Sequence, residues 1–445
     1  MPTYLDVGVV RIQSYIARTP DLRLRRGASW LLSDATSASA ISEWIGSSPE
    51  VAINDDAGDA DGVICLRVPP GREEEIATKL LLHLRSRLPG ADLQALWATG
   101  ETYPDARLKM SDPFVALPPV QDFPLANTCE ACRVDVRVAG EFCADCVARD
   151  QAGGRRTARG ESPDALGAER EILAAVNEIA SRELRPVRDF GDLAALGDGN
   201  GNHLATVALD GNGIGALFAS LDGRHKKDIS RAISATTRTA LIRSAASLLK
   251  DSETRLPVIP HVIGGDDIVV TVVADRAWTF TRSFLSQFDA GMTELAQKSG
   301  IPEEVRLPTM SAGLVFAHCK FPYARAVHLA EEMLRGAKRD TYGERAAVGW
   351  LDVTEDGEAA PHWRRAFPLA EVEHLSEGLR ALGKIGKSGR QALQRCLGHR
   401  SEEEAMAAAQ VWARRNNHPA VGDLLRNVSV ADARNLLSIT RWWRP

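Results

Sequence analysis

Apolar runs of strand length alternate with longer amphipathic stretches through most of the chain. Continuous or alternating apolar residues bounded by turn residues predict strands, and apolar residues three and four apart predict helices. The first part of the chain is predicted to form strands over residues 3–10, 51–54, 62–68 and 91–98, with helices over 27–45 and 73–88. A later part is predicted to form strands over 204–209, 258–263, 268–273 and 309–317, with helices over 225–250 and 276–298. Both parts have the order β-α-β-β-α-β, which predicts an internal duplication of a ferredoxin-like unit.

The repeat and its surroundings predict an α+β protein with five consecutive regions. A helix over 323–339 and an added strand over 346–353 follow the second repeat, and residues 360–445 show helical patterns without strands. Residues 150–163 have the composition of a flexible basic linker, and 165–184 that of an amphipathic helix. We expect an N-terminal unit at 1–122, a metal-binding ribbon at 123–150, a linker and helix at 151–200, a second unit at 201–358 and a helical domain at 359–445.

The composition argues against a general electrostatic attraction between the protein and nucleic acid. The 445 residues are 44% hydrophobic and 25% charged, as in an ordinary soluble protein. The formal net charge of −5 creates no overall basic field, so nucleic-acid contacts must be local or supplied by partners. No apolar run approaches a membrane span, and residues 1–5 lack the basic start of a signal peptide. These features predict a cytoplasmic protein.

Two adjacent acids follow a glycine pair in the middle of the second repeat. Gly264-Gly265 separates two β-branched runs, which predicts a tight hairpin turn, and Asp266 and Asp267 come next, at the start of an apolar strand. Carboxylates at the mouth of a buried strand are costly unless they are neutralised, and a divalent metal is a common partner. These four residues alone equally allow a solvated turn at the edge of a sheet.

A second acidic motif lies upstream and favours the metal. The apolar run 204–209 ends in Asp210-Gly211-Asn212-Gly213. An acid at a strand end, followed by a glycine-rich corner, can place a metal ligand beside backbone N–H groups that face phosphates. In a β-α-β-β-α-β sheet the first and third strands are neighbours, so Asp210 and Asp266 should meet. That geometry suits two-metal phosphoryl transfer.

These motifs resemble the second palm domain of the large polymerase–cyclase subunit of type III CRISPR effector complexes. The Gly-Gly-Asp-Asp hairpin of that family is matched by residues 264–267, and its acidic strand end by residues 209–213. Its following strand and loop are matched by residues 311–322. The related GGDEF cyclases share the fold, but their signature ends in Glu-Phe where this chain has Asp267-Ile268.

The resemblance implies two ferredoxin-like palm domains joined by a zinc ribbon and followed by a helical domain. It also implies a cyclase that joins ATP into cyclic oligoadenylate, with two Mg²⁺ or Mn²⁺ ions held by Asp210, Asp266 and Asp267. The nucleotide-binding residues that it implies are Gly211, Asn212, Gly213, Gly264, Gly265, Ser311 and Lys338, with Arg345 as a weaker candidate. The expected partners are the other subunits of such a complex, and guide and target RNA through them, but no membrane.

The first repeat lacks this chemistry. Its first strand ends in Gly8-Val9-Val10, without a carboxylate, and the acids Asp55, Asp56, Asp59 and Asp61 precede the third strand without a glycine pair. We interpret these acids as a solvated loop and the first unit as a degenerate palm that supplies a packing surface. No His-Asp pair occurs in the first eighty residues, so we do not expect the HD nuclease activity that many members of the family carry.

Four of the seven cysteines form two closely spaced pairs. Cys129 and Cys132, then Cys143 and Cys146, have the spacing of two knuckles around one tetrahedral zinc ion. Disulfides are the alternative, but a chain without a secretory signal argues against them. Because all four positions are filled, we expect a structural rather than a catalytic zinc.

Two other functions remain open from the sequence. The chain could be a catalytically silent scaffold subunit of an RNA-guided complex, although the intact Gly264–Asp267 motif argues against decay. It could also be a stand-alone cyclase that makes another cyclic nucleotide, for instance from GTP. Migration in gel filtration as a large ribonucleoprotein would favour a cyclase or a scaffold within a CRISPR complex. Migration as a free monomer or dimer would favour the stand-alone cyclase.

Overall fold

The computed structural model describes most of the chain. The described residues are 1–46, 50–54, 57, 62–111, 115–117, 127–153, 168–198, 202–220, 223–299, 301, 305–361, 364–398 and 401–443. The acidic loop of the first repeat and most of the expected basic linker lie outside these ranges. Among the described helices, none has the length and apolar content that crossing a membrane requires.

The second sheet has six strands in the order β11-β10-β9-β6-β8-β7. Its central strand β6 (His203–Asn212) lies between β8 (Asp267–Val273) and β9 (Thr309–His318), antiparallel to both. β7 (Val258–Gly264) flanks β8, β10 (Ala347–Asp352) runs parallel to β9, and the two-residue β11 (Phe367–Pro368) ends the sheet. β11 corrects the expectation that no strand follows residue 360.

Apolar side chains from both faces of β6 are buried, so this strand is enclosed between two layers of helices. Ala205, Val207 and Leu209 share a core with α10 (Gly223–Ser247) and α11 (Ala277–Ser299). Ala208 points to the other face, where it shares a core with α12 (Tyr323–Asp340). A strand covered on both faces needs continuous rather than alternating apolar residues, which explains the sequence of β6.

The first sheet repeats the strand order of the second. It has five strands in the order β2-β3-β1-β4-β5, with β1 (Thr3–Val10) between β3 (Val63–Val68) and β4 (Asp92–Thr99). The remaining strands are β2 (Ala52–Ile53) and β5 (Val115–Leu117), and α4 (Glu73–Arg87) connects β3 to β4. The predicted repeat of strand order is confirmed.

The helices after β1 differ from the single helix predicted over 27–45. The structure has α1 (Ile12–Ala17), α2 (Leu22–Ala35) and α3 (Ala38–Ile45). Gly27, which we expected to open a helix, lies inside α2. A Cβ atom at this position would come within 2.0 Å of the carbonyl oxygen of Arg149 on α6 (Ala144–Gly153), so the glycine permits two helices to pack closely.

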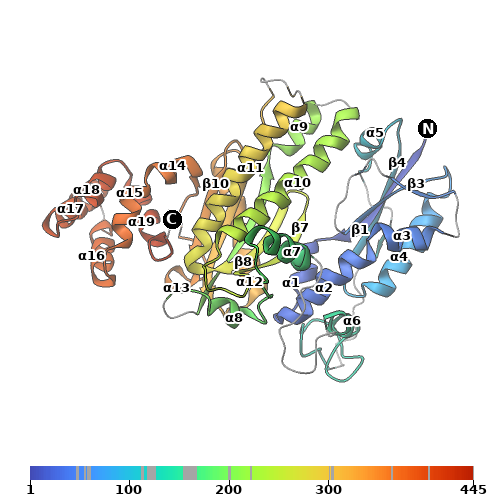
Figure 1. The fold of residues 1–445 in the computed structure, drawn as a ribbon, viewed down its shortest axis with the longest axis horizontal. Coiled ribbons are helices and arrows are strands. Elements are labelled where there is room, and N and C mark those ends of the chain that lie inside the picture. The colour runs from blue at the N-terminus through green and yellow to red at the C-terminus, as the bar shows by residue number, and fades with distance from the viewer. Residues whose placement is uncertain are drawn as a thin grey trace.

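The two halves share one core, and the C-terminal helices cover the far side of the second sheet. One apolar cluster joins Leu5 and Val7 of β1 to Val269 of β8 and Leu329 of α12. The remaining helices of the second half are α7 (Ala168–Ala180), α8 (Phe190–Ala194), α9 (Ile214–Ser220) and α13 (Val353–Asp356). The C-terminal helices, at the end of the molecule away from the first sheet in Figure 1, are α14 (Leu369–His374), α15 (Ser376–Gly383), α16 (Lys387–Leu397), α17 (Glu402–Arg415), α18 (Pro419–Arg426) and α19 (Val430–Ile439).

Candidate functional site

The turn between β7 and β8 lies one residue later in the chain than the sequence predicts. Gly264 pairs with Asp267, so the two turn residues are Gly265 and Asp266. Gly265 has φ of 61°, a conformation that favours glycine, whereas Asp266 needs no such backbone. The turn therefore separates the two acids: Asp266 lies at the tip and Asp267 begins the strand.

Asp210 of β6 lies beside this turn, as the strand order requires. Strand β6 extends through Asn212, so Asp210 and Gly211 belong to the strand and not to the corner that we expected. A Cβ atom on Gly211 would lie 2.7 Å from Asp266 Oδ2 and 2.4 Å from Ile214 Cδ1. Glycine at this position is thus what lets the Asp266 carboxylate approach β6.

The three carboxylates repel one another in a partly buried setting. Burial and then the neighbouring Asp210 raise the pKa of Asp266. Burial raises the pKa of Asp267 to about 7, with further contributions from Asp210, Asp266 and Glu331. A cation bound between these groups would relieve the repulsion, so the residues fit a divalent metal. The carboxylate oxygens are not gathered around one point as closely as the cysteine sulfurs are. Among the described acids, no three offer ligand atoms that all lie within 4.8 Å of one another.

Among the residues that the structure describes, Lys338 supplies the one positive charge that forms an ion pair with this cluster. Its Nζ donates to Asp210 Oδ2 at 2.5 Å and to the Gly211 carbonyl at 2.7 Å. The residue lies near the end of α12, on the same helix as Glu331. In this structure Lys338 therefore neutralises a carboxylate, and its contact with a triphosphate stays a prediction.

Two residues that we did not expect complete the surroundings of Asp267. Gln13 of α1 donates a hydrogen bond from Nε2 to Asp267 Oδ2, which joins the first half of the chain to the second. Glu331 of α12 contributes a further negative charge, and burial raises its pKa. Neither residue has a local signal, because each reaches the site only through the packing of α1 and α12 against the second sheet.

A cavity of about 290 Å³ opens beside Asp267, between the two halves. Its walls come from the end of β1, from α1 and α2, and from the β7 end of the hairpin; they include Val9, Arg11, Gln13, Ser33, Gly264 and Asp267. A cavity of this size, next to a cluster of carboxylates, can hold part of a small polar ligand.

The side chains of Asn212 and Ser311 have a supporting role instead of facing this cavity. Both residues are buried, and Asn212 Nδ2 donates to Ser311 Oγ at 2.9 Å, to Thr309 Oγ1 at 3.0 Å and to the Arg345 carbonyl at 3.2 Å. These bonds tie the end of β6 to β9. In this structure both side chains support the strand that carries Asp210, and their contact with a nucleotide stays a prediction. Gly213, with φ of 74°, turns the chain into α9.

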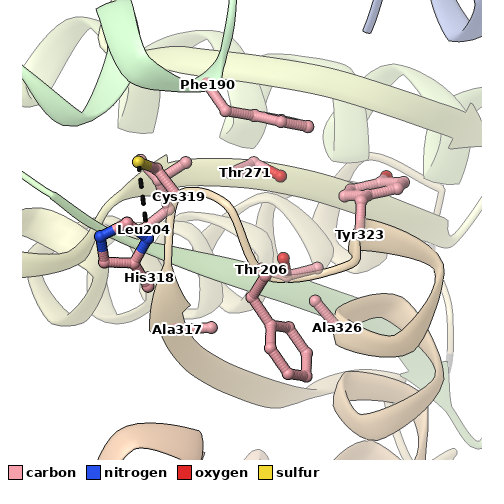
Figure 2. A pocket seen from close by; sticks show the side chains of 10 residues that line it. Phe190, Leu204, Thr206, Thr271, Ala317, His318, Cys319, Tyr323 and Ala326 are labelled. Atoms are coloured by element: carbon pink, nitrogen blue, oxygen red, sulfur yellow. Dashed lines mark hydrogen bonds between the residues drawn. The ribbon is translucent and has the colours of Figure 1, made fainter. Parts of the chain in front are cut away.

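A much smaller hollow lies on the same face of the second sheet (Figure 2). Phe190 and Tyr323 face each other across it, and Thr206 and Thr271 point into it from β6 and β8. Its volume of about 20 Å³ is close to that of one water molecule. His261 lies nearby, fully buried, and shares a hydrogen bond of 2.8 Å with Thr271 Oγ1. This histidine supports the fold, and it also lines the larger cavity beside Asp267.

The four clustered cysteines form a second candidate metal site. Their sulfur atoms all lie within 4.8 Å of one another, the residues are buried, and none forms a disulfide. Cys132 Sγ and Cys143 Sγ are 3.8 Å apart, which matches the S···S edge of about 3.8 Å in a tetrahedron with Zn–S bonds of about 2.3 Å. The four residues fit a structural zinc ion.

The second half of the chain matches a known domain by sequence. Residues 203–348 match the second palm domain of Cas10/Cmr2. The matched range contains Asp210, the Gly264–Asp267 hairpin and Lys338. The resemblance predicted from the motifs is confirmed for this domain. No curated protein sequence matches the chain.

Solved structures extend the likeness in fold to nearly the whole chain. The chain resembles Csm1 in a Csm1–Csm4 cassette with cA3, at 14% identity and a TM-score of 0.58, and in a cassette with cA4, at 13% and 0.56. It also resembles Csm1 from T. onnurineus, at 13% identity and a TM-score of 0.55. Each match covers 99% of this chain and 69% of the other. At these identities the likeness shows the fold.

Proposed function

We propose, from the premise that residues 203–348 form a Cas10/Cmr2 second palm domain, that the chain is a metal-dependent nucleotidyl cyclase. Its substrate is ATP and its product is cyclic oligoadenylate. The observation that carries this proposal is the meeting of Asp210, Asp266 and Asp267 beside a cavity, with the pKa of Asp266 raised and that of Asp267 raised to about 7. The cA3 and cA4 bound to the Csm1–Csm4 cassettes support the choice of product.

The three aspartates would hold two Mg²⁺ or Mn²⁺ ions. Such ions lower the pKa of an attacking hydroxyl and stabilise the leaving pyrophosphate. The chain's own residues position the reactants: Gln13 orients Asp267, and Gly211 leaves room for the Asp266 carboxylate beside β6. Lys338, now bonded to Asp210, is close enough to the acids to exchange that carboxylate for a phosphate oxygen. Positioning and charge stabilisation supply most of the catalysis, so no acid–base histidine is needed.

The proposed setting is a type III CRISPR complex. Csm1, whose fold this chain shares, was crystallised with Csm4 as a subcomplex of the type III-A Csm interference complex. We propose that this chain binds a subunit of that kind and reaches guide and target RNA through it. The first unit, which has no carboxylate in residues 8–10, would serve in catalysis as a wall of the cavity.

Product analysis tests the proposed reaction. Purified protein is incubated with all four NTPs and Mn²⁺, and the products are identified by mass spectrometry, with and without target RNA and partner subunits. Cyclic oligoadenylate supports the proposal, a different cyclic nucleotide corrects the substrate, and no product under any condition supports the silent scaffold.

The variant Asp266→Ala then tests whether the acidic cluster catalyses the reaction. Loss of one carboxylate from a two-metal site should reduce pyrophosphate release about a thousandfold or more. The fold should not be weakened, because removing one of three like charges relieves repulsion. Asp289→Ala is the matched control, since burial also raises the pKa of Asp289, to about 6, but the residue lies on α11. Retained activity in Asp266→Ala would place the reaction elsewhere.

A further inference from the structure

The four-cysteine segment, residues 127–150, packs its helix α6 against α2 and also contacts α1 through polar side chains. Helix α1 follows β1 through Arg11, which has a left-handed conformation with φ of 56°. It has only six residues, too few to be stable without tertiary contacts. Whatever packs against α1 therefore decides where its side chains point.

Both cysteine pairs contribute an acid that binds the end of α1. Asp135 lies three residues after Cys132, and Asp145 lies between Cys143 and Cys146. Arg18, directly after α1, donates to the Asp135 carboxylate and lies 3.8 Å from Asp145 Oδ2. The Arg18 side chain is only 10% exposed, so this ion pair is stronger than a surface pair.

An arginine of the segment binds the middle of α1. Arg149 is fully buried, donates to the Tyr15 carbonyl at 2.7 Å and lies over the Tyr15 ring at 4.3 Å from its centroid. Its Nε is bonded to Asp145 at 2.8 Å. Asp145 also accepts a hydrogen bond from the Gly90 backbone N–H at 3.1 Å. The segment thus fixes both the backbone and the end of α1.

The opposite side of α1 reaches the acidic cluster. Gln13, two residues before Tyr15, donates to Asp267 across the boundary between the two halves. We infer that the four-cysteine segment positions Gln13 against Asp267, and so regulates metal binding at the acidic site through α1. This inference concerns the site of the proposed function, and its effect on metal binding rests on that proposal.

Hydrogen exchange tests whether the four-cysteine segment holds α1 in place, and it requires no measurement of enzyme activity. The full-length, zinc-loaded protein is compared with Asp135→Ala, which removes the acid from Arg18 but keeps all four cysteines. We expect the amides of α1 to exchange at least tenfold faster in the variant, while those of β6 keep their protection. Asp34→Ala is the matched control, because Asp34 pairs with Arg87 in the same half but away from α1. Unchanged exchange in α1 would overturn the inference.

Manganese affinity tests the link to the site. Mn²⁺ binding is measured by electron paramagnetic resonance, without nucleotide, for the wild type, Gln13→Ala, Asp135→Ala and the double variant. Loss of an outer partner of a metal ligand typically weakens binding about 10- to 100-fold, so Gln13→Ala should show an effect of that size. Asp135→Ala should weaken binding less, and the double variant no more than Gln13→Ala alone.

The outcomes separate the two proposals. Independent, multiplying effects of Gln13→Ala and Asp135→Ala would mean that the segment does not act through Gln13, and would overturn the inference. If the wild type binds no Mn²⁺ at the acids, the proposed function fails instead, and the exchange of α1 alone then decides whether the segment positions this helix.

Discussion

Asp267 has the most perturbed surroundings of the three acids. Its pKa, about 7 in the folded protein against 3.8 in an unfolded chain, means that the fold holds a proton that the unfolded chain releases between about pH 4 and 7. Because the folded state binds more protons over that range, its stability decreases as the pH rises. A bound divalent cation would reverse this trend by favouring the ionised form.

The pH dependence can be measured against Asp267→Asn, which cannot ionise. Without added divalent metal, the variant should gain stability over the wild type as the pH rises from 5 to 8. One unit of pKa shift corresponds to about 1.4 kcal/mol, so the gap should reach at least about 1 kcal/mol. Thermal melts of both proteins across this range are the measurement. Parallel curves would show that the Asp267 carboxyl titrates normally.

At the residue scale, short motifs predicted the acids but not their partners. Asp210 and Asp266 stand at strand ends in a recognisable pattern, and strand order alone brings them together. Gln13, Glu331 and the ion pair of Lys338 with Asp210 depend on how two helices pack on a sheet. Hydrophobic periodicity predicts the buried face of such helices. It does not predict which polar residue lies next to which acid.

At the element scale, the end of β6 is built around the space at Gly211. Gly211→Ala should push the Asp266 carboxylate and Ile214 away, because the new methyl group would lie within 2.7 Å of both side chains. We expect at least a tenfold loss of Mn²⁺ affinity. Gly215→Ala is the control on the adjoining helix, since a Cβ atom there meets nothing within 4 Å. Equal affinities in the two variants would contradict this account.

The four-cysteine segment has little regular structure to hold it without metal. Before α6, its described residues are joined by isolated bridges such as Thr128 to Val136. We expect one zinc ion per chain by metal analysis and an early unfolding step in Cys132→Ser, since thiolate zinc sites contribute on the order of 10 kcal/mol to local folding. Purified wild-type protein without zinc, or an unchanged melt of the variant, would refute this expectation.

Element boundaries show where local patterns lose to tertiary contacts. The hairpin was predicted correctly, but its turn is displaced by one residue because Gly264 pairs with Asp267. The helix predicted over 27–45 is two helices, and Gly27 lies inside the first because α6 packs there. The pairing that shifts the hairpin is local, whereas the contact that requires Gly27 comes from α6, a distant part of the chain.

At the scale of the whole molecule, the C-terminal tail ties the helical domain to the second sheet. Trp442 stacks on Phe316 of β9 with ring centroids 5.5 Å apart, and its indole N–H donates to the buried Asp352 at 2.6 Å. Trp443 packs on Trp278 at 4.4 Å. A terminal Trp-Trp pair is more often a docked tail than a binding platform, but it has no pattern that identifies its partner.

Trp442→Ala should destabilise the protein by about 3–5 kcal/mol, as for other buried tryptophans. Trp442→Phe, which keeps a stacking ring and loses the N–H donor to Asp352, should cost about 1–3 kcal/mol. Denaturant unfolding of both variants distinguishes the two contributions. A surface role for the tail would leave both midpoints at the wild-type value.

The bond from Gln13 to Asp267 has a consequence for how the two repeats change over evolutionary time. A duplicated unit without acids would be expected to drift freely, because no reaction depends on it. Here the end of its first strand and its first helix form part of the wall around Asp267. Selection should therefore hold Val9, Gln13 and Ser33 nearly fixed among descendants, while exposed positions on the same unit, such as Leu82, vary.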